Sequence, residues 1–369
     1  MLTKKIIPVY QPSLTGNEKK YVIDCLDSTW ISSRGSYISK FEQAFAQYIG
    51  VKHAVCVSNG TVALHLALLG LGIGKGDEVI VPTLTYIASV NAITYTGATP
   101  VFVDSEREYW QIDPNEIEKL ITPKTKAIMP VHLYGAACDM SSIMKIARKH
   151  DLYVIEDCAE AIGTKFGDQY VGSFGDIAAF SFFGNKTITT GEGGMIITNN
   201  ETLYDRCIHI KGQGLAKHRQ YWHDIIGYNY RMTNICAAIG LAQFEQIETF
   251  ITKKRQIAEW YKKFLKNNVH IQFQKESKGT FHTYWMCSIL VEDSNDRELL
   301  RDYLDKAGIE TRPLFFPVHT MPMYGINYRC FYNAEWLGWR GINLPSFPGL
   351  IEEQVQYICD KINEYFKII

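Results

Sequence analysis

The chain of 369 residues is long enough for two packed domains, or for one large domain with a smaller lobe. Hydrophobic residues make up 46% of it and charged residues 21%, which is ordinary for a globular protein. The formal net charge of -1 argues against a protein that binds nucleic-acid phosphates, and no apolar stretch approaches the roughly 20 residues that span a bilayer.

Nine cysteines lie singly along the chain, without a CxxC pair. No Cys and His residues have the spacing of a structural zinc site, so we expect no metal. Scattered cysteines in an odd number are typical of reduced thiols, and the N-terminal residues have too short an apolar run for a secretion signal. These patterns predict a cytoplasmic protein.

Short apolar runs alternate with helical patterns in the first part of the chain. The runs predict buried strands at residues 54–57, 78–81, 99–103, 127–131 and 152–155. The intervening patterns predict helices at residues 62–71, 86–96 and 141–150. This alternation is typical of a parallel sheet with helices on both faces, and ligands bind beyond the carboxyl ends of such strands.

The later part of the chain has a different pattern. It predicts one long helix from about residue 240 to 265, then a strand at 283–291, a helix at 297–307 and a last helix at 352–366. We therefore predict an α/β protein with a large domain over residues 1–245 and a smaller α+β domain, including the connecting helix, over residues 246–369. The sequence leaves open that the N-terminal segment packs on the smaller domain.

A single lysine stands out in the segment AAFSFFGNKTITTGEGGM, residues 178–195. A strand-like run ends at Gly184, Lys186 follows, and a glycine-rich turn then lets the chain double back. A lysine becomes a nucleophile toward aldehydes when its surroundings lower its pKa and hold the amine in place. A solvated loop lysine is the alternative, and the apolar flanking residues argue against it.

A carboxylate follows a predicted buried strand in the segment LYVIEDCAE, residues 152–160. A pyridoxal ring needs a carboxylate beside its ring nitrogen, because the pairing keeps that nitrogen protonated. Asp157 lies where the carboxyl edge of the sheet is expected to open, so it could supply this carboxylate. It could equally cap the following helix.

The segment Ser-Asn-Gly-Thr, residues 58–61, precedes a predicted helix. Small residues at a helix N-terminus present backbone N–H groups and a positive dipole end, which suit a phosphate, although ordinary N-capping by Asn59 or Thr61 is the alternative. The chain has neither a GxxxxGK[ST] motif nor a GxGxxG motif after a strand. With Tyr86 as a stacking aromatic, these features together meet the requirements of pyridoxal phosphate.

Five segments, in this order, resemble the nucleotide-sugar aminotransferases of the DegT type: SNGTVALHLAL, PTLTYIAS, VIEDCAEA, SFFGNKTITTGEGGM and GYNYRMT. The resemblance extends over nearly the whole chain. It implies pyridoxal 5'-phosphate and the aspartate-aminotransferase-like fold (fold type I), with a mostly parallel central sheet and a smaller C-terminal α+β domain. The chain is most similar to members that use L-glutamate to aminate GDP-4-keto-6-deoxy-D-mannose, giving GDP-perosamine for the O-antigen of lipopolysaccharide.

The resemblance assigns roles to single residues. Lys186 matches the lysine that binds the cofactor covalently, and Asp157 matches the partner of the pyridine nitrogen. Glu160 falls where the family places a residue near the ring hydroxyl of the cofactor, and many members have glutamine there. Tyr86 matches the aromatic that stacks on the ring. The positions that hold the phosphate are Gly60, Thr61, Ser181 and, from the neighbouring subunit, Asn229, which implies a homodimer with composite sites.

Other segments resemble loops that line the substrate pocket in relatives. The side chains concerned are Trp30, Ser32, Arg219, Arg231 and His319. The two arginines could meet the diphosphate, because a planar guanidinium suits paired phosphate oxygens. They could instead be charges of the surface or of a subunit interface, and the histidine, which lies between prolines, could simply be packed and hydrogen-bonded.

Four other functions stay open. An aminotransferase for a dTDP- or UDP-linked keto-sugar would have the same motifs, since the nucleotide preference rests on the resemblance alone. A sugar dehydratase of this type carries histidine at the position of Lys186, which argues against it. A cofactor-free Schiff-base aldolase would leave Asp157 and the phosphate seat without a role. A non-catalytic regulator would have no need of the lysine and aspartate pair.

Overall fold

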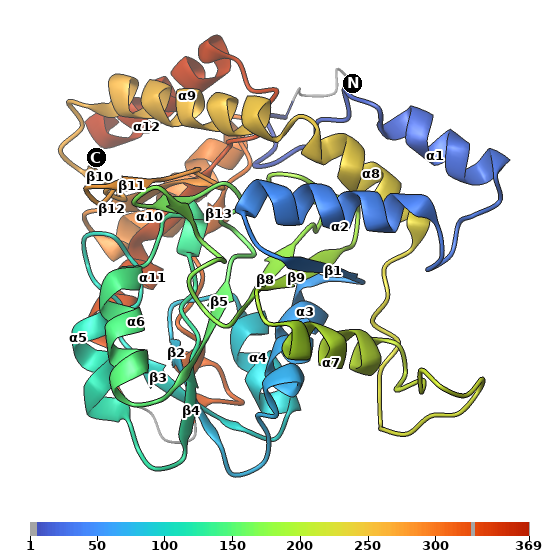
Figure 1. Ribbon diagram of the computed structural model, residues 1–369. Helices are drawn as coiled ribbons and strands as arrows, with labels where there is room; N and C mark the ends of the chain where they lie inside the picture. Colours follow the sequence, from blue (N-terminus) through green and yellow to red (C-terminus); the bar gives the residue numbers. More distant parts are fainter. Residues whose placement is uncertain (1–5, 326–328, 369) are drawn as a thin grey trace.

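A seven-stranded sheet forms the centre of the larger part of the molecule (Figure 1). The computed structural model describes residues 6–325 and 329–368. The strands, in spatial order, are β1 (His53–Val57), β9 (Gly194–Thr198), β8 (Ile177–Ser181), β5 (Tyr153–Asp157), β4 (Thr125–Ile128), β2 (Glu78–Pro82) and β3 (Thr99–Val103). β9 is antiparallel to both neighbours and every other pair is parallel, which confirms the predicted mostly parallel sheet.

Helices cover both faces of this sheet (Figure 1). One face carries α2 (Ser36–Ile49), α6 (Met140–Lys149) and α8 (Asn234–Phe244), with α1 (Glu18–Asp27) packed against α8. The other face carries α3 (Gly60–Leu71), α4 (Ile87–Tyr95) and α7 (Glu201–Lys211). In β1, Cys56 packs toward the first set of helices and the adjacent Val55 and Val57 toward the second, because successive side chains of a strand alternate.

A smaller antiparallel sheet lies in the C-terminal part of the chain. Its strands, in spatial order, are β10 (Ile271–Phe273), β12 (Cys287–Val291), β14 (Gly341–Leu344) and β13 (Arg312–Pro313). The helices of this part are α9 (Ile247–Leu265), α10 (Ser294–Lys306), α11 (Tyr332–Arg340) and α12 (Glu352–Ile368). Ile7 joins its apolar core and pairs with Ile309, so the N-terminal segment packs here.

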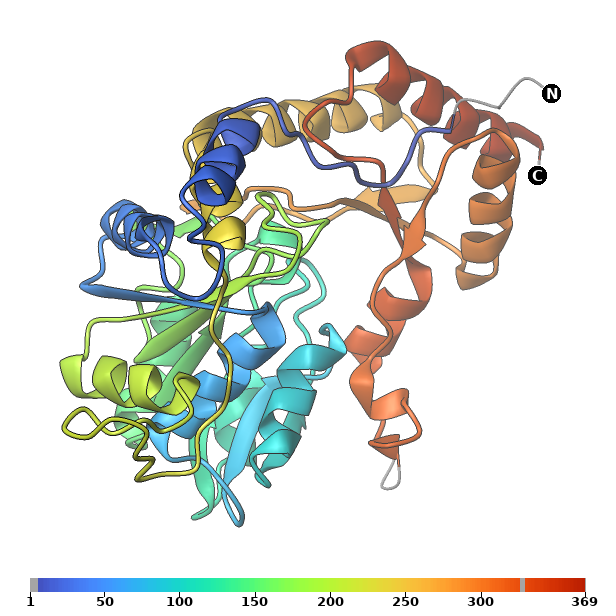
Figure 2. The same ribbon diagram turned by 90° about the vertical axis from the view of Figure 1, so that its right-hand side faces the viewer.

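Short elements complete the fold. A three-stranded sheet of β11 (Thr280–Phe281), β6 (Lys165–Phe166) and β7 (Gln169–Tyr170) pairs the two parts of the chain. The short helical turns are α5 (Pro114–Ile117), η1 (Glu118–Leu120), η2 (Leu133–Gly135) and η3 (Val318–Thr320). In Figure 2 residues 314–325, which follow β13, run down beside the larger part, where the hydroxyl of Tyr324 donates to Asn91 at 2.8 Å. Within the described ranges, no helix has both the length and the apolar composition needed to cross a bilayer.

The predicted continuous helix over residues 240–265 is wrong. α8 ends at Phe244 and α9 begins at Ile247, and Gln246 between them adopts φ -108 and ψ 7. The side chain of Gln246 bonds to the N-terminal segment, accepting from Thr15 at 3.0 Å and donating to Glu18 at 3.3 Å. α8 packs in the core of the larger part, and α9 starts in that same core with Ile247, Phe250 and Ile251 before it enters the core of the smaller part from Ile257 on. We propose the domain boundary at residues 245 and 246, where the helix breaks shortly before the chain passes from one core to the other.

Two predicted strands are too long. β4 ends at Ile128 rather than residue 131, because Pro130 has no N–H with which to continue the ladder. β12 begins at Cys287 rather than residue 283, because Tyr284 has a φ of 50 and a strand cannot continue through this left-handed conformation. The sequence patterns did not predict α1, α2, α7 or α11.

Candidate active site

The residues predicted to hold a cofactor follow four strands of the large sheet. β1 leads into Gly60, β2 into Tyr86 and β8 into Lys186, while β5 ends at Asp157. All four strands run in the same direction, because β1 and β8 are both antiparallel to β9 and the others are parallel to β8 through β5 and β4. Their carboxyl ends therefore meet at one edge, where open α/β sheets bind ligands.

Lys186 lies in a confined position between carboxylates and an aromatic ring. Its Nζ is 3.6 Å from Oε1 of Glu160 and 3.8 Å from the ring centroid of Trp285. Burial lowers the pKa of Lys186, and the charges of Glu160 and Asp157 oppose that shift. A lysine that acts as a nucleophile requires both properties, a fixed amine and easier deprotonation.

Asp157 is 4% exposed and is held by two hydrogen bonds. Its Oδ2 accepts from the hydroxyl of Ser89 at 2.7 Å, and its Oδ1 accepts from the N–H of Ala159 at 3.0 Å. Burial raises the pKa of Asp157, while these two donors and the charge of Lys186 favour the ionised carboxylate. Ser89 was not predicted as a site residue, because only the tertiary packing of α4 brings it to the end of β5.

The N-terminus of α3 lies against the end of β8. Asn59 caps the helix, since its side chain accepts from the N–H of Val62 at 3.0 Å. A Cβ atom at Gly60 would lie 2.7 Å from the Cβ of Ser181, so only glycine fits there. Two residues that were predicted to hold a phosphate, Gly60 and Ser181, are thus brought together, beside helix N–H groups that have no partner within the helix.

Two residues outside the large sheet hold the turn that carries Lys186. The indole N–H of Trp285 donates to the carbonyl of Asn185 at 2.8 Å, and the hydroxyl of Tyr10 donates to the carbonyl of Lys186. The buried Lys254 donates in turn to the carbonyl of Trp285 at 3.0 Å. Tyr10 and Trp285 were not predicted as site residues, because they lie far from Lys186 in the chain and no motif contains them.

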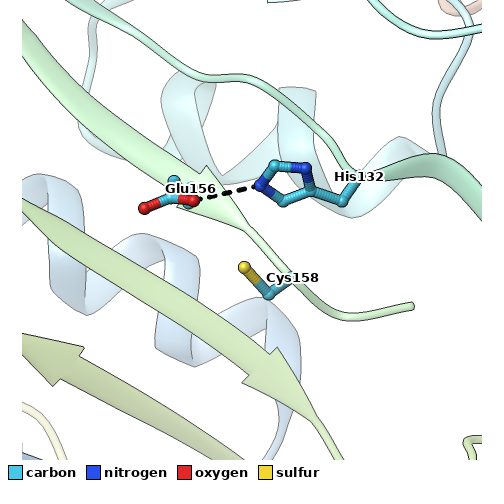
Figure 3. A group of neighbouring side chains, drawn as sticks. All are labelled: His132, Glu156 and Cys158. Atoms are coloured by element: carbon cyan, nitrogen blue, oxygen red, sulfur yellow. Dashed lines mark hydrogen bonds and ion pairs between the residues drawn. The ribbon is translucent and has the colours of Figure 1, made fainter. Parts of the chain in front are cut away.

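A buried group of side chains, His132, Glu156 and Cys158, includes the two residues that flank Asp157 in the chain (Figure 3). The N–H of Cys138 donates to Nδ1 of His132, so the ring proton is on Nε2, which donates to Glu156 at 3.1 Å. Cys158 lies beside His132 and Glu156, and burial raises the pKa of its thiol to about 12. The sulfur therefore stays protonated and is a poor metal ligand. The donor atoms that could hold a metal ion are therefore already used or protonated.

We expect Glu156→Gln to destabilise the fold by about 2–4 kcal/mol, because an amide nitrogen cannot accept the buried hydrogen bonds that the carboxylate accepts. Besides His132, three backbone N–H groups donate to Glu156, from Gly172, Phe174 and Gly175. Urea unfolding of the purified protein measures the difference. The matched control is Glu353→Gln on the exposed side of α12, which should stay within about 0.5 kcal/mol of the parent. Equal stability of the two variants would contradict the prediction.

The aromatic residue predicted to stack on the cofactor is accessible. Tyr86 is 56% exposed at the start of α4, and its ring centroid is 5.5 Å from that of Phe315. Trp30 and Ser32 are also exposed, and their carbonyls accept hydrogen bonds from Asn234 at 2.7 and 2.6 Å. The loop with the two predicted sugar contacts is thus fixed to the N-terminus of α8.

The other predicted substrate residues lie in two different settings. Arg219 and Arg231 are exposed in the segment between α7 and α8, residues 212–233, which projects from the larger part (Figure 1). Arg231 donates to the side chain of Asn229 at 3.2 Å, in the same segment. His319 is 3% exposed, and its ring nitrogens bond to Thr83 at 2.6 Å and Glu335 at 3.1 Å. Its contact with a sugar stays a prediction.

The groups at this edge fit pyridoxal phosphate. The cofactor needs an amine for its aldehyde, a carboxylate for its ring nitrogen and anion-binding N–H groups for its phosphate. Lys186, Asp157 and the N-terminus of α3 are the matching groups, and the tight approach at Gly60 leaves no side chain over the helix end.

The chain matches a family of aminotransferases over nearly its whole length. Residues 12–363 match the model of the DegT/DnrJ/EryC1/StrS aminotransferase family. The chain is 68% identical over 362 residues to the GDP-perosamine synthase of Escherichia coli O157:H7. The aligned residues cover 98% of this chain and 99% of that protein. It is 52% identical over 368 residues to the GDP-perosamine synthase of Vibrio cholerae, and the aligned residues cover 99% of this chain and 100% of that protein.

Solved structures of aminotransferases have the same fold. Helicobacter pylori PseC, an aminotransferase involved in the biosynthesis of pseudoaminic acid, matches with a TM-score of 0.94 and 28% identity over 99% of this chain and 100% of that chain. The aminotransferase from Psychrobacter cryohalolentis matches with a TM-score of 0.91 and 32% identity over 97% and 98%. The expected fold class is confirmed. The chain belongs to the DegT/DnrJ/EryC1/StrS aminotransferase family.

Proposed function

We propose that this aminotransferase uses pyridoxal phosphate to transfer an amino group from L-glutamate to GDP-4-keto-6-deoxy-D-mannose, forming GDP-perosamine for the O-antigen of lipopolysaccharide. The transamination chemistry rests on the amine of Lys186, which is largely enclosed, lies 3.6 Å from Glu160 and is influenced by the charge of Asp157. The two relatives at 68% and 52% identity are both named GDP-perosamine synthase, and these names support the proposed sugar and the proposed nucleotide of the substrate.

Each site residue has a defined task in this proposal. When bound, pyridoxal phosphate supplies an electron sink that lets a proton leave the carbon beside the transferred nitrogen. Lys186 binds the cofactor covalently and, once its amine is free, removes and returns that proton. Asp157 holds the ring nitrogen protonated. The N-terminus of α3 and the hydroxyl of Ser181 bind the phosphate, and Tyr86 orients the ring.

A substrate panel tests the proposal. The purified holoenzyme is incubated with isotope-labelled glutamate and GDP-, dTDP- or UDP-linked keto-sugars, and the products are identified by mass spectrometry and NMR. We expect the label at the former 4-keto carbon of the GDP-linked sugar. Faster amination of a dTDP- or UDP-linked sugar would overturn the nucleotide assignment. A product that lacks a hydroxyl and carries no label would indicate a dehydratase.

We also propose a homodimer in which each subunit completes the site of the other. The segment between α7 and α8 exposes large apolar side chains, among them Tyr221 at 93% and Ile226 at 91%. Exposed apolar groups that gather on one segment mark interaction sites more often than free surface. Asn229 lies in the same segment, so docking of this segment on a second copy would carry the asparagine with it.

Mixing two inactive variants distinguishes shared sites from separate ones. We expect Asn229→Ala to weaken phosphate binding and turnover strongly, and Lys186→Ala to be inactive. Subunits mixed after mild dissociation should regain about a quarter of the parent activity, because half of the random dimers are mixed and one of their two sites is intact. A mixture no more active than its components would contradict the shared sites, and a monomer in light scattering would contradict the dimer itself.

We propose a cytoplasmic location for this enzyme. All nine cysteines are free thiols, and most of them are buried. Free thiols persist in reducing compartments, whereas proteins of oxidising compartments tend to form disulfides. The cysteine chemistry therefore supports the location expected from the sequence.

A further inference from the structure

Glu160 is a buried carboxylate in which one oxygen accepts a hydrogen bond from the backbone and the other faces the amine of Lys186. It is 5% exposed, and its Oε2 accepts from the backbone N–H of Tyr134 at 2.8 Å. Its Oε1 lies 3.6 Å from Nζ of Lys186, a distance at which the pair attract each other but no short hydrogen bond fixes the proton. The geometry leaves Oε1 free to receive a proton from Lys186.

The surroundings shift the proton affinities of this acid and this base toward each other. Burial raises the pKa of Glu160 to about 7, and the charge of Asp157 raises it further while Lys186 opposes the shift. Burial lowers the pKa of Lys186, and the charges of Glu160 and Asp157 oppose that change. When the pKa values of a neighbouring acid and base shift toward each other, the free-energy cost of moving a proton from the base to the acid falls.

The other titratable groups around the pair keep their protons. Tyr134 lies beside Glu160, and burial raises the pKa of its phenol, whose oxygen accepts from the N–H of Phe315 at 2.9 Å. The hydroxyl of Tyr10 donates to the carbonyl of Lys186, and burial raises the pKa of this phenol too. Neither phenol takes the proton of Lys186.

Asp157 is not available for the same task. Its two oxygens already accept from Ser89 and Ala159, and both bonds favour the ionised form. In the proposed function its charge is engaged by the ring nitrogen. Of the two carboxylates that act on Lys186, Glu160 is therefore the one with an oxygen open to the amine.

We propose that Glu160 is the proton acceptor of Lys186, holding the amine as an ammonium in the cofactor-free site and taking its proton when the amine reacts. This inference rests on the proposed covalent attachment of pyridoxal phosphate to Lys186. Glutamine at this position could accept the N–H of Tyr134 but could not take up a proton, so the carboxylate has a role of its own.

The proton transfer balances within the pair. The ammonium of Lys186 loses one proton to Glu160, which becomes a neutral carboxyl, and the freed nitrogen can attack the aldehyde carbon. Lys186 nitrogen then forms its double bond to that carbon, and its two remaining hydrogens leave with the aldehyde oxygen as one water. The same exchange lets the released amine start each half-reaction neutral, which a base that removes a proton from carbon requires.

The test follows cofactor capture rather than turnover. Apoenzyme of the parent and of Glu160→Gln is mixed with excess pyridoxal phosphate at a series of pH values, and the rate is read from the absorbance change. Borohydride reduction and peptide mass spectrometry confirm that the adduct is on Lys186. The matched control is Glu192→Gln, which removes one charge from an exposed position in the same glycine-rich turn.

We expect the pH midpoint of capture to fall by about one unit or more in Glu160→Gln, because a carboxylate within a few ångströms favours the ammonium form of a lysine. For a fall of one unit, capture at one unit below the parent midpoint should then be about fivefold faster than in the parent, because about half of the lysine is neutral there instead of about a tenth. The pH midpoint of capture in Glu192→Gln should equal that of the parent, since solvent screens the charge of Glu192.

An unchanged or higher midpoint in Glu160→Gln, with the adduct still on Lys186, would overturn this inference and leave the proposed function intact. An adduct absent from Lys186 in the parent enzyme would instead overturn the proposed function. Thermal unfolding of all three proteins checks that the variants are folded, and Glu160→Asp, which keeps the charge, should restore a midpoint closer to that of the parent.

Discussion

Lys186→Ala should leave a folded protein that binds no cofactor covalently and transfers amino groups about 10^4-fold more slowly than the parent. The substitution removes both the amine that attaches the cofactor and the base that moves the proton at carbon. The yellow colour of the purified protein should disappear, and borohydride treatment should leave no adduct detectable by mass spectrometry. Turnover is measured with glutamate and the GDP-linked keto-sugar.

Two comparisons make this result specific to Lys186. Lys124→Ala removes an exposed lysine from the opposite end of the sheet and should leave colour and turnover unchanged. A small primary amine added to Lys186→Ala should restore part of the activity, because it can enter the space of the lost side chain and act as the base. Amination of the sugar by Lys186→Ala at more than a few per cent of the parent rate, without added amine, would refute the assignment.

Asp157→Asn should bind the cofactor but slow the proton transfer by roughly a thousandfold, which corresponds to about 4 kcal/mol in the activation barrier. Asparagine keeps the size of the side chain but carries no charge, so it cannot hold the ring nitrogen protonated. A ring with a neutral nitrogen withdraws less electron density from the reacting carbon. We expect kcat to fall far more than the apparent KM for either substrate. The absorption spectrum of the bound cofactor should also change.

The matched control for Asp157 is Asp176, which precedes β8 and contacts the other end of β5. Oδ2 of Asp176 accepts from the N–H of Val154 at 2.8 Å, so Asp176→Asn also disturbs a carboxylate that holds β5. This variant should lose stability but keep its turnover, because it lies away from the carboxyl edge of the sheet. Near-normal kcat in Asp157→Asn, or an equal loss in both variants, would remove Asp157 from its proposed role.

The order of the strands along the chain and the location of the site could be predicted from the sequence. The short apolar runs became β1 to β5, and the segments that carry Gly60, Asp157 and Lys186 follow β1, end β5 and follow β8. Local signals suffice here, because a buried strand needs a continuous apolar run and a loop lysine stands out only by its immediate neighbours. The resemblance to a family then connected these segments to one cofactor.

The breaks in regular structure were not predictable in the same way. The pattern of residues 240–265 suits a continuous helix, yet the helix breaks at Gln246, whose side chain bonds to Thr15 and Glu18 of the N-terminal segment. The strand predicted from residue 283 begins only at Cys287, since Tyr284 takes a left-handed conformation. In both places tertiary packing outweighs local propensity.

The sequence by itself determined which chemical groups this protein carries at the ends of its strands: a lysine in a glycine-rich turn, a carboxylate after an apolar run and small residues ahead of a helix. Only the tertiary structure decided how those groups are held. Ser89 meets Asp157, Trp285 and Tyr10 fix the turn of Lys186, and Glu160 faces its amine. Hydrogen bonds and desolvation depend on distances between residues far apart in the chain, and those distances exist only once both parts have packed together.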